Sequence, residues 1–234
     1  MHCKIIFLFC ILFSGKIFAQ KFTTSIYAQL SLPQQDYYKA SADAGFGIRA
    51  NFLYKPSTTV PIKFGLELGM QEKGRQTQYF SGFIYGFYDE FKVSATNNIF
   101  SLMLLTRFQP SQINNKSRFF GRLKPFLDLS AGWNVFFSTV DVERQTYYSS
   151  YNDNYSKSTK AHWAFTFGPA AGLDIPLNKY DDLGLELKVA YLFGGNTKYL
   201  TDPYIDNNAN VSFKEKESRT DMLIPQVGIR ITIK

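Results

Sequence analysis

Nine charged residues stand inside otherwise apolar or small-residue stretches of this 234-residue chain. They are Arg49, Lys63, Arg107, Lys188 and Arg230, against Glu67, Asp128, Asp174 and Glu186. Five are basic and four are acidic, so their charges nearly cancel. Buried charges are tolerated in proteins when they pair and hydrogen-bond. Two chemistries are open for this set: a closed polar network of ion pairs, or a gated path for ions or protons.

A second group of candidate residues is aromatic and lies in two long segments, 74–94 and 141–160. The first segment contains Phe83, Tyr85, Phe87 and Tyr88, and the second contains Tyr147, Tyr148, Tyr151 and Tyr155. Aromatic side chains on exposed loops can bind glycans or proteins. In the alternative interpretation, each segment extends the neighbouring strands and ends in a polar tip.

Residues 1–20 have the pattern of a cleaved secretory signal peptide: a short basic start, an apolar run too short to span a bilayer, and a small-residue end. Both cysteines, Cys3 and Cys10, lie in this segment, so the mature chain has no thiolate chemistry. Loss of Lys4 and Lys16 lowers the net charge from +7 to +5 (24 basic minus 19 acidic residues). Without basic clusters or binding motifs, we predict no nucleic-acid partner, no cofactor and no metal site.

The elements that carry these residues are predicted to be β-strands, because apolar residues alternate with polar or small ones along eight segments. The segments are 22–32, 43–55, 61–73, 95–108, 124–140, 161–175, 183–193 and 223–233. Short connections alternate with connections of about twenty residues, a pattern typical of an up-and-down meander. The stretch from Pro110 to Leu123 is longer than its place in this pattern predicts.

One face of these strands carries no Asp, Glu, Lys or Arg. It comprises every second residue of 22–32, 44–54, 62–70, 100–108, 125–137, 163–175, 183–193 and 223–233. A charge facing the middle of a bilayer costs about 2–4 kcal/mol, which explains the exclusion. The opposite face holds nine of the sixteen glycines and all nine charged candidates. The lumen of an eight-stranded barrel just accommodates its own side chains, so the bulky apolar face must point outward.

The predicted fold class is therefore all-β. We expect an eight-stranded antiparallel up-and-down transmembrane β-barrel over residues 21–234, with long extracellular loops and shorter periplasmic turns.

In this architecture the chain resembles the OmpA/OmpX-like superfamily of eight-stranded outer-membrane barrels, which includes the PorT-like proteins of Gram-negative bacteria. The final strand, Val227 to Ile233, resembles the signal that the barrel-insertion machinery reads, but Ile233-Lys234 replaces the usual terminal aromatic residue. The resemblance implies an outer-membrane location after signal cleavage, with lipid and lipopolysaccharide around the barrel. It also implies a structural or interaction protein that acts through its surface loops or as an accessory subunit of an envelope complex.

Two other functions stay open. A small channel or porin-like protein is one, although eight strands leave no continuous aqueous channel, which favours a polar plug. The other is a lipid A-modifying enzyme, because some barrels of this superfamily use a histidine and a serine for that reaction. The mature chain has a single histidine, His162, and lacks a His-x-Ser arrangement, so we predict no catalytic residue and no enzyme.

Overall fold

The computed structural model describes residues 21–40, 43–57, 59–84, 87–110, 123–144, 155–158, 161–205 and 211–233. The predicted signal peptide, residues 1–20, lies outside the described residues, so its cleavage stays a prediction.

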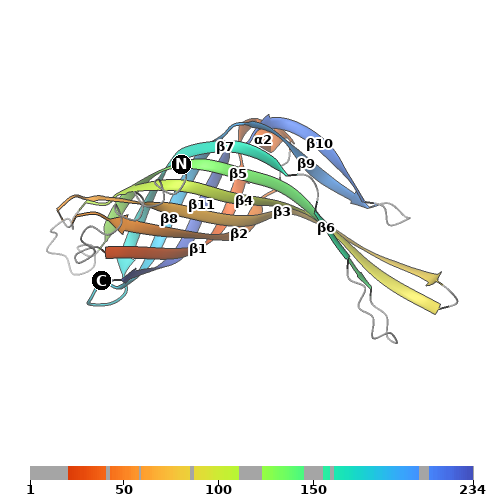
Figure 1. Ribbon diagram of the computed structural model, residues 1–234, viewed down its shortest axis with the longest axis horizontal. Helices are drawn as coiled ribbons and strands as arrows, with labels where there is room; N and C mark the ends of the chain where they lie inside the picture. Colours follow the sequence, from red (N-terminus) through yellow and green to blue (C-terminus); the bar gives the residue numbers. More distant parts are fainter. Residues whose placement is uncertain are drawn as a thin grey trace, which may run out of the picture.

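Eight strands form the wall of a closed barrel (Figure 1). In order around the barrel they are β1 (Lys21–Pro33), β2 (Gly45–Lys55), β3 (Ile62–Ile84), β4 (Phe87–Phe108), β5 (Lys124–Arg144), β7 (His162–Pro176), β8 (Leu183–Gly194) and β11 (Met222–Ile233). All neighbouring strands are antiparallel. The ring closes because β11 pairs with β1, with Ser25 opposite Arg230. The predicted eight-stranded antiparallel up-and-down barrel is confirmed.

The apolar face of the wall points away from the lumen. Phe46, Leu104 and Trp163 are 66%, 67% and 64% exposed, and further exposed hydrophobic residues lie on every strand of the wall. The residues that alternate with them on the inner face of the strands, such as Arg49 and Arg107, are buried. This exposed apolar belt confirms the predicted orientation of the two faces and is the surface that a transmembrane barrel presents to lipid. Among the described residues, no helix has the length and hydropathy needed to cross a membrane.

The long connections contain more regular structure than the predicted strand bounds allowed. β3 and β4 continue through most of segment 74–94, and β5 pairs with the short strand β6 (Tyr155–Ser158). A register shift between Glu72 and Arg75 is accommodated by Gly74, whose φ of 75° suits glycine. Beyond this irregularity, both hairpins project from one end of the barrel (Figure 1). Cross-strand pairing therefore continues beyond the residues whose apolar alternation marks the membrane-spanning part of the strands.

Two further elements lie over the same end of the barrel. A short helix, α2 (Gln35–Ala40), connects β1 to β2, and a separate hairpin of β9 (Asn196–Ile205) and β10 (Val211–Arg219) connects β8 to β11. β9 contacts β3, β4, β5 and β7, and β10 contacts α2 (Figure 1). We call α2, β9 and β10 the cap. The opposite end carries the short turns, the start of β1 and the end of β11, and so corresponds to the periplasmic end.

Candidate functional site

A chain of buried ion pairs crosses the lumen. Arg49 of β2 donates from Nη1 to Glu67 Oε1 of β3 at 2.6 Å. The other carboxylate oxygen of Glu67 accepts a hydrogen bond from Lys188 of β8. Lys188 Nζ also lies 3.5 Å from Asp128 Oδ2 of β5. All four residues are at most 4% exposed, so each charge depends on these partners rather than on water.

Arg107 of β4 occupies the centre of this network. Its Nε and Nη2 donate to the two oxygens of Asp128 at 2.7 and 3.0 Å, and its Nη1 donates to Glu186 Oε1 at 2.7 Å. The hydroxyl of Tyr27 donates to the other oxygen of Glu186. The guanidinium carbon lies 3.7 Å from the ring centroid of Phe126. Arginine is suited to this position because its planar fork can pair with two carboxylates while its face stacks on a ring.

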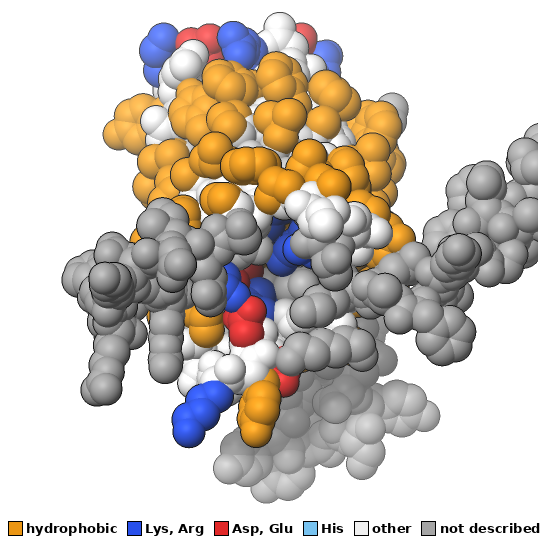
Figure 2. Space-filling view, turned by 90° about the vertical axis from the view of Figure 1, so that its left-hand side faces the viewer, with side chains coloured by type: hydrophobic (Ala, Val, Ile, Leu, Met, Phe, Trp, Pro, Cys, Tyr) orange, Lys and Arg blue, Asp and Glu red, His pale blue; other side chains and the backbone are white. Residues whose placement is uncertain are grey.

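A second cluster lies at the periplasmic end of the lumen. Arg230 Nε donates to Asp174 Oδ1 at 2.9 Å, and its Nη2 donates at 2.8 Å to Asp181 Oδ1 in the turn between β7 and β8. Lys63 donates to Gln109 Oε1 at 2.8 Å, and Gln109 Nε2 donates to Asp174 at 3.2 Å. Figure 2 shows acidic and basic side chains gathered in a hollow at this end, with a belt of hydrophobic side chains above it.

Asp181 is the carboxylate of this cluster that lies outside the membrane-spanning strands. Burial tends to raise its pKa, but the hydrogen bond and charge of Lys124, together with the charge of Arg230, hold the pKa below its ordinary value. Asp181 therefore carries a full negative charge at neutral pH. It links the turn to β5 through Lys124 and to β11 through Arg230.

Close packing around Arg230 explains one glycine of the inner face. A Cβ atom on Gly184 would lie 2.6 Å from Asp174 Oδ1 and 2.7 Å from Arg230 Nη2. Because real Cβ atoms do not approach other atoms so closely, any larger residue would displace this ion pair. Small residues on the inner face thus make room for the long charged side chains.

At the extracellular end, aromatic rings pack against one another. Tyr37 of α2 packs edge-to-face on Tyr199 of β9, with 5.1 Å between ring centroids, and on Phe136 of β5, with 6.3 Å. Lys73 Nζ lies 3.5 Å from the centroid of the Tyr37 ring. Burial raises the pKa of Tyr37 well above its ordinary value, which keeps the hydroxyl neutral.

Lys73 lies extracellular to Met70, where the lipid-facing apolar row of β3 ends, and is only 4% exposed. Burial lowers its pKa from 10.5 to about 7, although the nearby Asp43 acts in the opposite direction. Its ammonium group therefore titrates near neutral pH beneath the cap.

The structure brings together the nine charged residues predicted from the sequence through the contacts described above. The aromatic loop candidates are placed less completely. Phe83 and Tyr88 pair across β3 and β4 near Phe87, and Tyr155 begins β6. Tyr85, Tyr147, Tyr148 and Tyr151 lie outside the described residues.

The histidine considered for catalysis, His162, is half-buried at the start of β7, opposite Phe136. In the part of the chain that the structure describes, no three His, Cys, Asp or Glu residues group as metal ligands would.

Sequence reasoning missed several residues of the site. Tyr27 lies on the inner face of the first predicted strand, so its position in the alternating pattern could have assigned it to the lumen. Gln109 and Asp181 lie beyond strand ends, where alternation gives no direction. Tyr37 and Tyr199 are brought together by the folding of two separate connections, for which the sequence pattern holds no signal.

A closed ring of eight antiparallel strands, an apolar outer belt and a polar lumen define this chain as an integral membrane β-barrel of the outer-membrane type, with OmpA/OmpX-like architecture.

Solved structures of similar architecture include three outer-membrane proteins. Neisserial surface protein A is 9% identical, with 91% of this chain and 96% of that chain covered and a TM-score of 0.42. OprG from Pseudomonas aeruginosa is 14% identical, with coverages of 92% and 95% and a TM-score of 0.42. A major outer membrane protein from Thermus thermophilus is 11% identical, with coverages of 92% and 100% and a TM-score of 0.40. No family model and no curated protein matches the chain. Likeness at these values carries no inference about function.

Proposed function

We propose that this protein is a non-conducting barrel of the Gram-negative outer membrane that acts as a structural or interaction protein. In this proposal, residues 1–20 direct export and are removed, and the barrel-insertion machinery recognises the last strand. The surface hairpins then contact lipopolysaccharide or a protein partner in an envelope complex. The proposal rests mainly on the network centred on Arg107.

This network favours a plug over a pore. Its members come from β1, β2, β3, β4, β5 and β8, so hydrogen-bonded side chains join opposite parts of the wall. An ion passing through would have to displace desolvated pairs whose geometry depends on one another. Above them, Tyr37 and Tyr199 of the cap pack on Phe136 of the wall and form a second, apolar layer.

Planar-bilayer recording of the purified protein tests the plug. We expect no stable conductance steps at neutral pH. The variant Arg107→Ala, combined with Glu186→Ala, serves as a positive control for an opened lumen, because the two substitutions remove the central arginine and one of its two carboxylate partners. Stable, large steps in the unmodified protein would overturn the proposal in favour of a channel.

The interaction role is tested by shortening the β3–β4 hairpin. Thr77 and Ser94 are cross-strand partners, so residues 78–93 can be replaced by an Asn-Gly turn without changing the register below. We expect affinity purification in mild detergent to recover a defined partner with the full chain and to lose it with the shortened variant. An unchanged set of co-purifying proteins would contradict a role for this hairpin.

Folding of the shortened variant is checked by the heat-dependent shift of the folded barrel on a gel. The matched control is Tyr79→Ala in the full-length hairpin, a single change at a residue that is 70% exposed. Comparing the two variants distinguishes loss of the whole hairpin from loss of one aromatic contact.

A further inference from the structure

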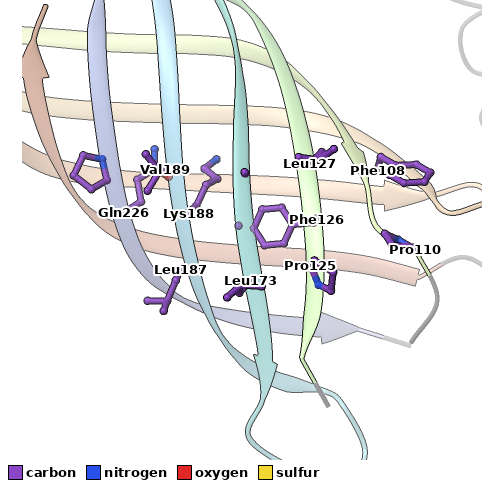
Figure 3. Close-up of a pocket in the computed structure, with 13 residues that line it drawn as sticks. Phe108, Pro110, Pro125, Phe126, Leu127, Leu173, Leu187, Lys188, Val189 and Gln226 are labelled. Carbon is purple, nitrogen blue, oxygen red and sulfur yellow. The ribbon is translucent and has the colours of Figure 1, made fainter. Parts of the chain in front are cut away.

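An apolar trough with a volume of about 700 Å³ lies in the lipid-facing belt (Figure 3). One bank is a row of cross-strand partners: Phe108, Leu127, Ala171, Val189 and Pro225. Pro125, Leu173 and Leu187 form the facing bank. The volume lies in the range of small-molecule binding sites.

The trough exists because one position in the first bank is small. Ala171 stands between Leu127 and Val189, which are 59% and 50% exposed and project outward on either side. The floor follows the inward-facing row that includes Gly172, where the Phe126 ring approaches β7 from the lumen (Figure 3). The floor row consists of Phe126, Gly172, Lys188 and Gln226, while the banks are apolar side chains.

The direction of the trough matters for its occupant. It begins at Phe108, the last residue of β4, at the periplasmic rim. It ends at Pro225, four residues into β11 from the extracellular side, because the register of each strand is offset from the last. Five strands about 4.8 Å apart give a length of about 19 Å. Half of a hydrocarbon core of about 30 Å is about 15 Å, so an oblique chain from the inner leaflet can lie along the trough.

We propose that this trough is a binding site for one acyl chain of a glycerophospholipid from the periplasmic leaflet. The trough opens directly onto the hydrocarbon layer, which makes an alkyl chain its natural occupant. Its lower end, at Phe108 and Pro125, lies at the periplasmic rim of the wall, whereas lipopolysaccharide occupies the opposite leaflet. Binding depends on apolar area removed from contact with mobile lipid and on the fit between the two banks.

Native mass spectrometry of the barrel, released from bilayers of palmitoyl-oleoyl phosphatidylethanolamine, tests the site. We expect one phospholipid to stay bound through detergent exchange. Ala171→Phe fills the middle of the trough and is expected to reduce retention about tenfold, equivalent to about 1.4 kcal/mol. Val189→Trp, which narrows the same point from the next strand, provides a second variant if the first fails to fold.

The matched control is Ala50→Phe. Ala50 belongs to the outward-facing row of β2 and does not line the trough, so the variant adds the same ring elsewhere on the wall. Its phospholipid retention should stay within twofold of the unmodified protein. Equal retention in all folded variants would overturn the proposal, as would retention of no phospholipid.

This site is independent of whether the lumen is plugged. A conducting protein that still retained the phospholipid would overturn the proposed function and leave the trough intact. Conversely, Ala171→Phe should leave bilayer recordings unchanged, because the side chain points away from the lumen.

Discussion

The lumen around Arg107 and the extracellular mouth around Tyr37 are both almost completely buried, but they are filled by opposite chemistry. In the lumen, arginine, lysine and carboxylate groups from the strands neutralise one another. At the mouth, aromatic rings from α2, β5 and β9 pack edge-to-face. Ion pairs fix the strands of a narrow wall in register, whereas an apolar contact can hold a separable element such as the cap. Substitutions in the lumen should therefore lower the stability of the whole barrel, whereas substitutions at the mouth should loosen only the cap.

The largest effect is expected from Arg107→Ala. Glu186 and Asp128 would lose their main partner while remaining desolvated, and breaking a buried pair in this way costs about 3–5 kcal/mol. The loss should appear as lower global stability in urea titrations of the protein folded into lipid vesicles, monitored by tryptophan fluorescence.

The control for Arg107 is Arg75→Ala. Arg75 pairs with Glu72 at 2.8 Å, but the two side chains are 60% and 40% exposed. Such exposed pairs contribute about 0–1 kcal/mol, so this variant should unfold close to the unmodified protein. Similar losses for both variants would contradict the distinction between buried and exposed pairs.

A smaller global effect is expected from Gly184→Ala. The added Cβ atom would collide with the Arg230–Asp174 pair, and overpacking of this kind costs about 1–3 kcal/mol. Gly69→Ala is the comparison, because its added Cβ atom would lie 3.1 Å from its nearest neighbour, Arg49 Nε, rather than 2.6 Å from Asp174 Oδ1 as at Gly184. Urea titration should rank Gly184→Ala below Gly69→Ala in stability, and the reverse order would show that the periplasmic cluster can rearrange.

The two regions also differ in how far the sequence predicts them. Alternation identified the faces of the wall, so Arg49, Glu67 and Arg107 could be assigned to one lumen before any contact was known. The individual ion pairs could not be predicted, because the partner of each charge depends on the stagger between strands that are distant in sequence. Glu67 of β3 and Lys188 of β8 are an example. The cap was not predicted at all. Tyr37 and Tyr199 lie in connections without a repeating sequence pattern. Their position at the mouth is known only from their packing on Phe136 in the structure.

Tyr37→Leu should affect the mouth and spare the wall. The substitution keeps an apolar side chain but removes two edge-to-face contacts, worth about 1–2 kcal/mol together. Amide hydrogen exchange in β9 and β10 should therefore accelerate about tenfold, since about 1.4 kcal/mol corresponds to a factor of ten. Tyr38→Leu is the control, because Tyr38 is the next residue of α2 and is 58% exposed. A matching change in urea stability would mean that the cap and the wall unfold together.

An effect of similar size at the mouth is expected from titration of Lys73. Tyr37 and Tyr199 face it as neutral phenols near pH 7, and Asp43 is its nearest acidic neighbour. With the cap closed its pKa is about 7, against 10.5 when it is exposed to water. Between pH 7 and pH 10.5, the form with the cap open binds more protons than the form with the cap closed. The closed form therefore gains stability as the pH rises above 7. The gain from pH 6 to pH 8 is about 1.4 kcal/mol, a factor of about ten.

Hydrogen exchange in β9 and β10, corrected for the intrinsic pH dependence of amide exchange, measures this gain. Protection should increase about tenfold from pH 6 to pH 8 in the unmodified protein and stay constant in Lys73→Met, which packs a similar length of chain without a charge. Lys39→Met is the control, since the Lys39 side chain is 78% exposed in α2 and its titration is not linked to burial beneath the cap. If the pH dependence of protection persisted in Lys73→Met, another group at the mouth would be responsible for it. If the pH dependence disappeared, the buried Lys73 ammonium group would be its cause. The aromatic mouth would then differ from the ion-paired lumen in being sensitive to pH near neutrality.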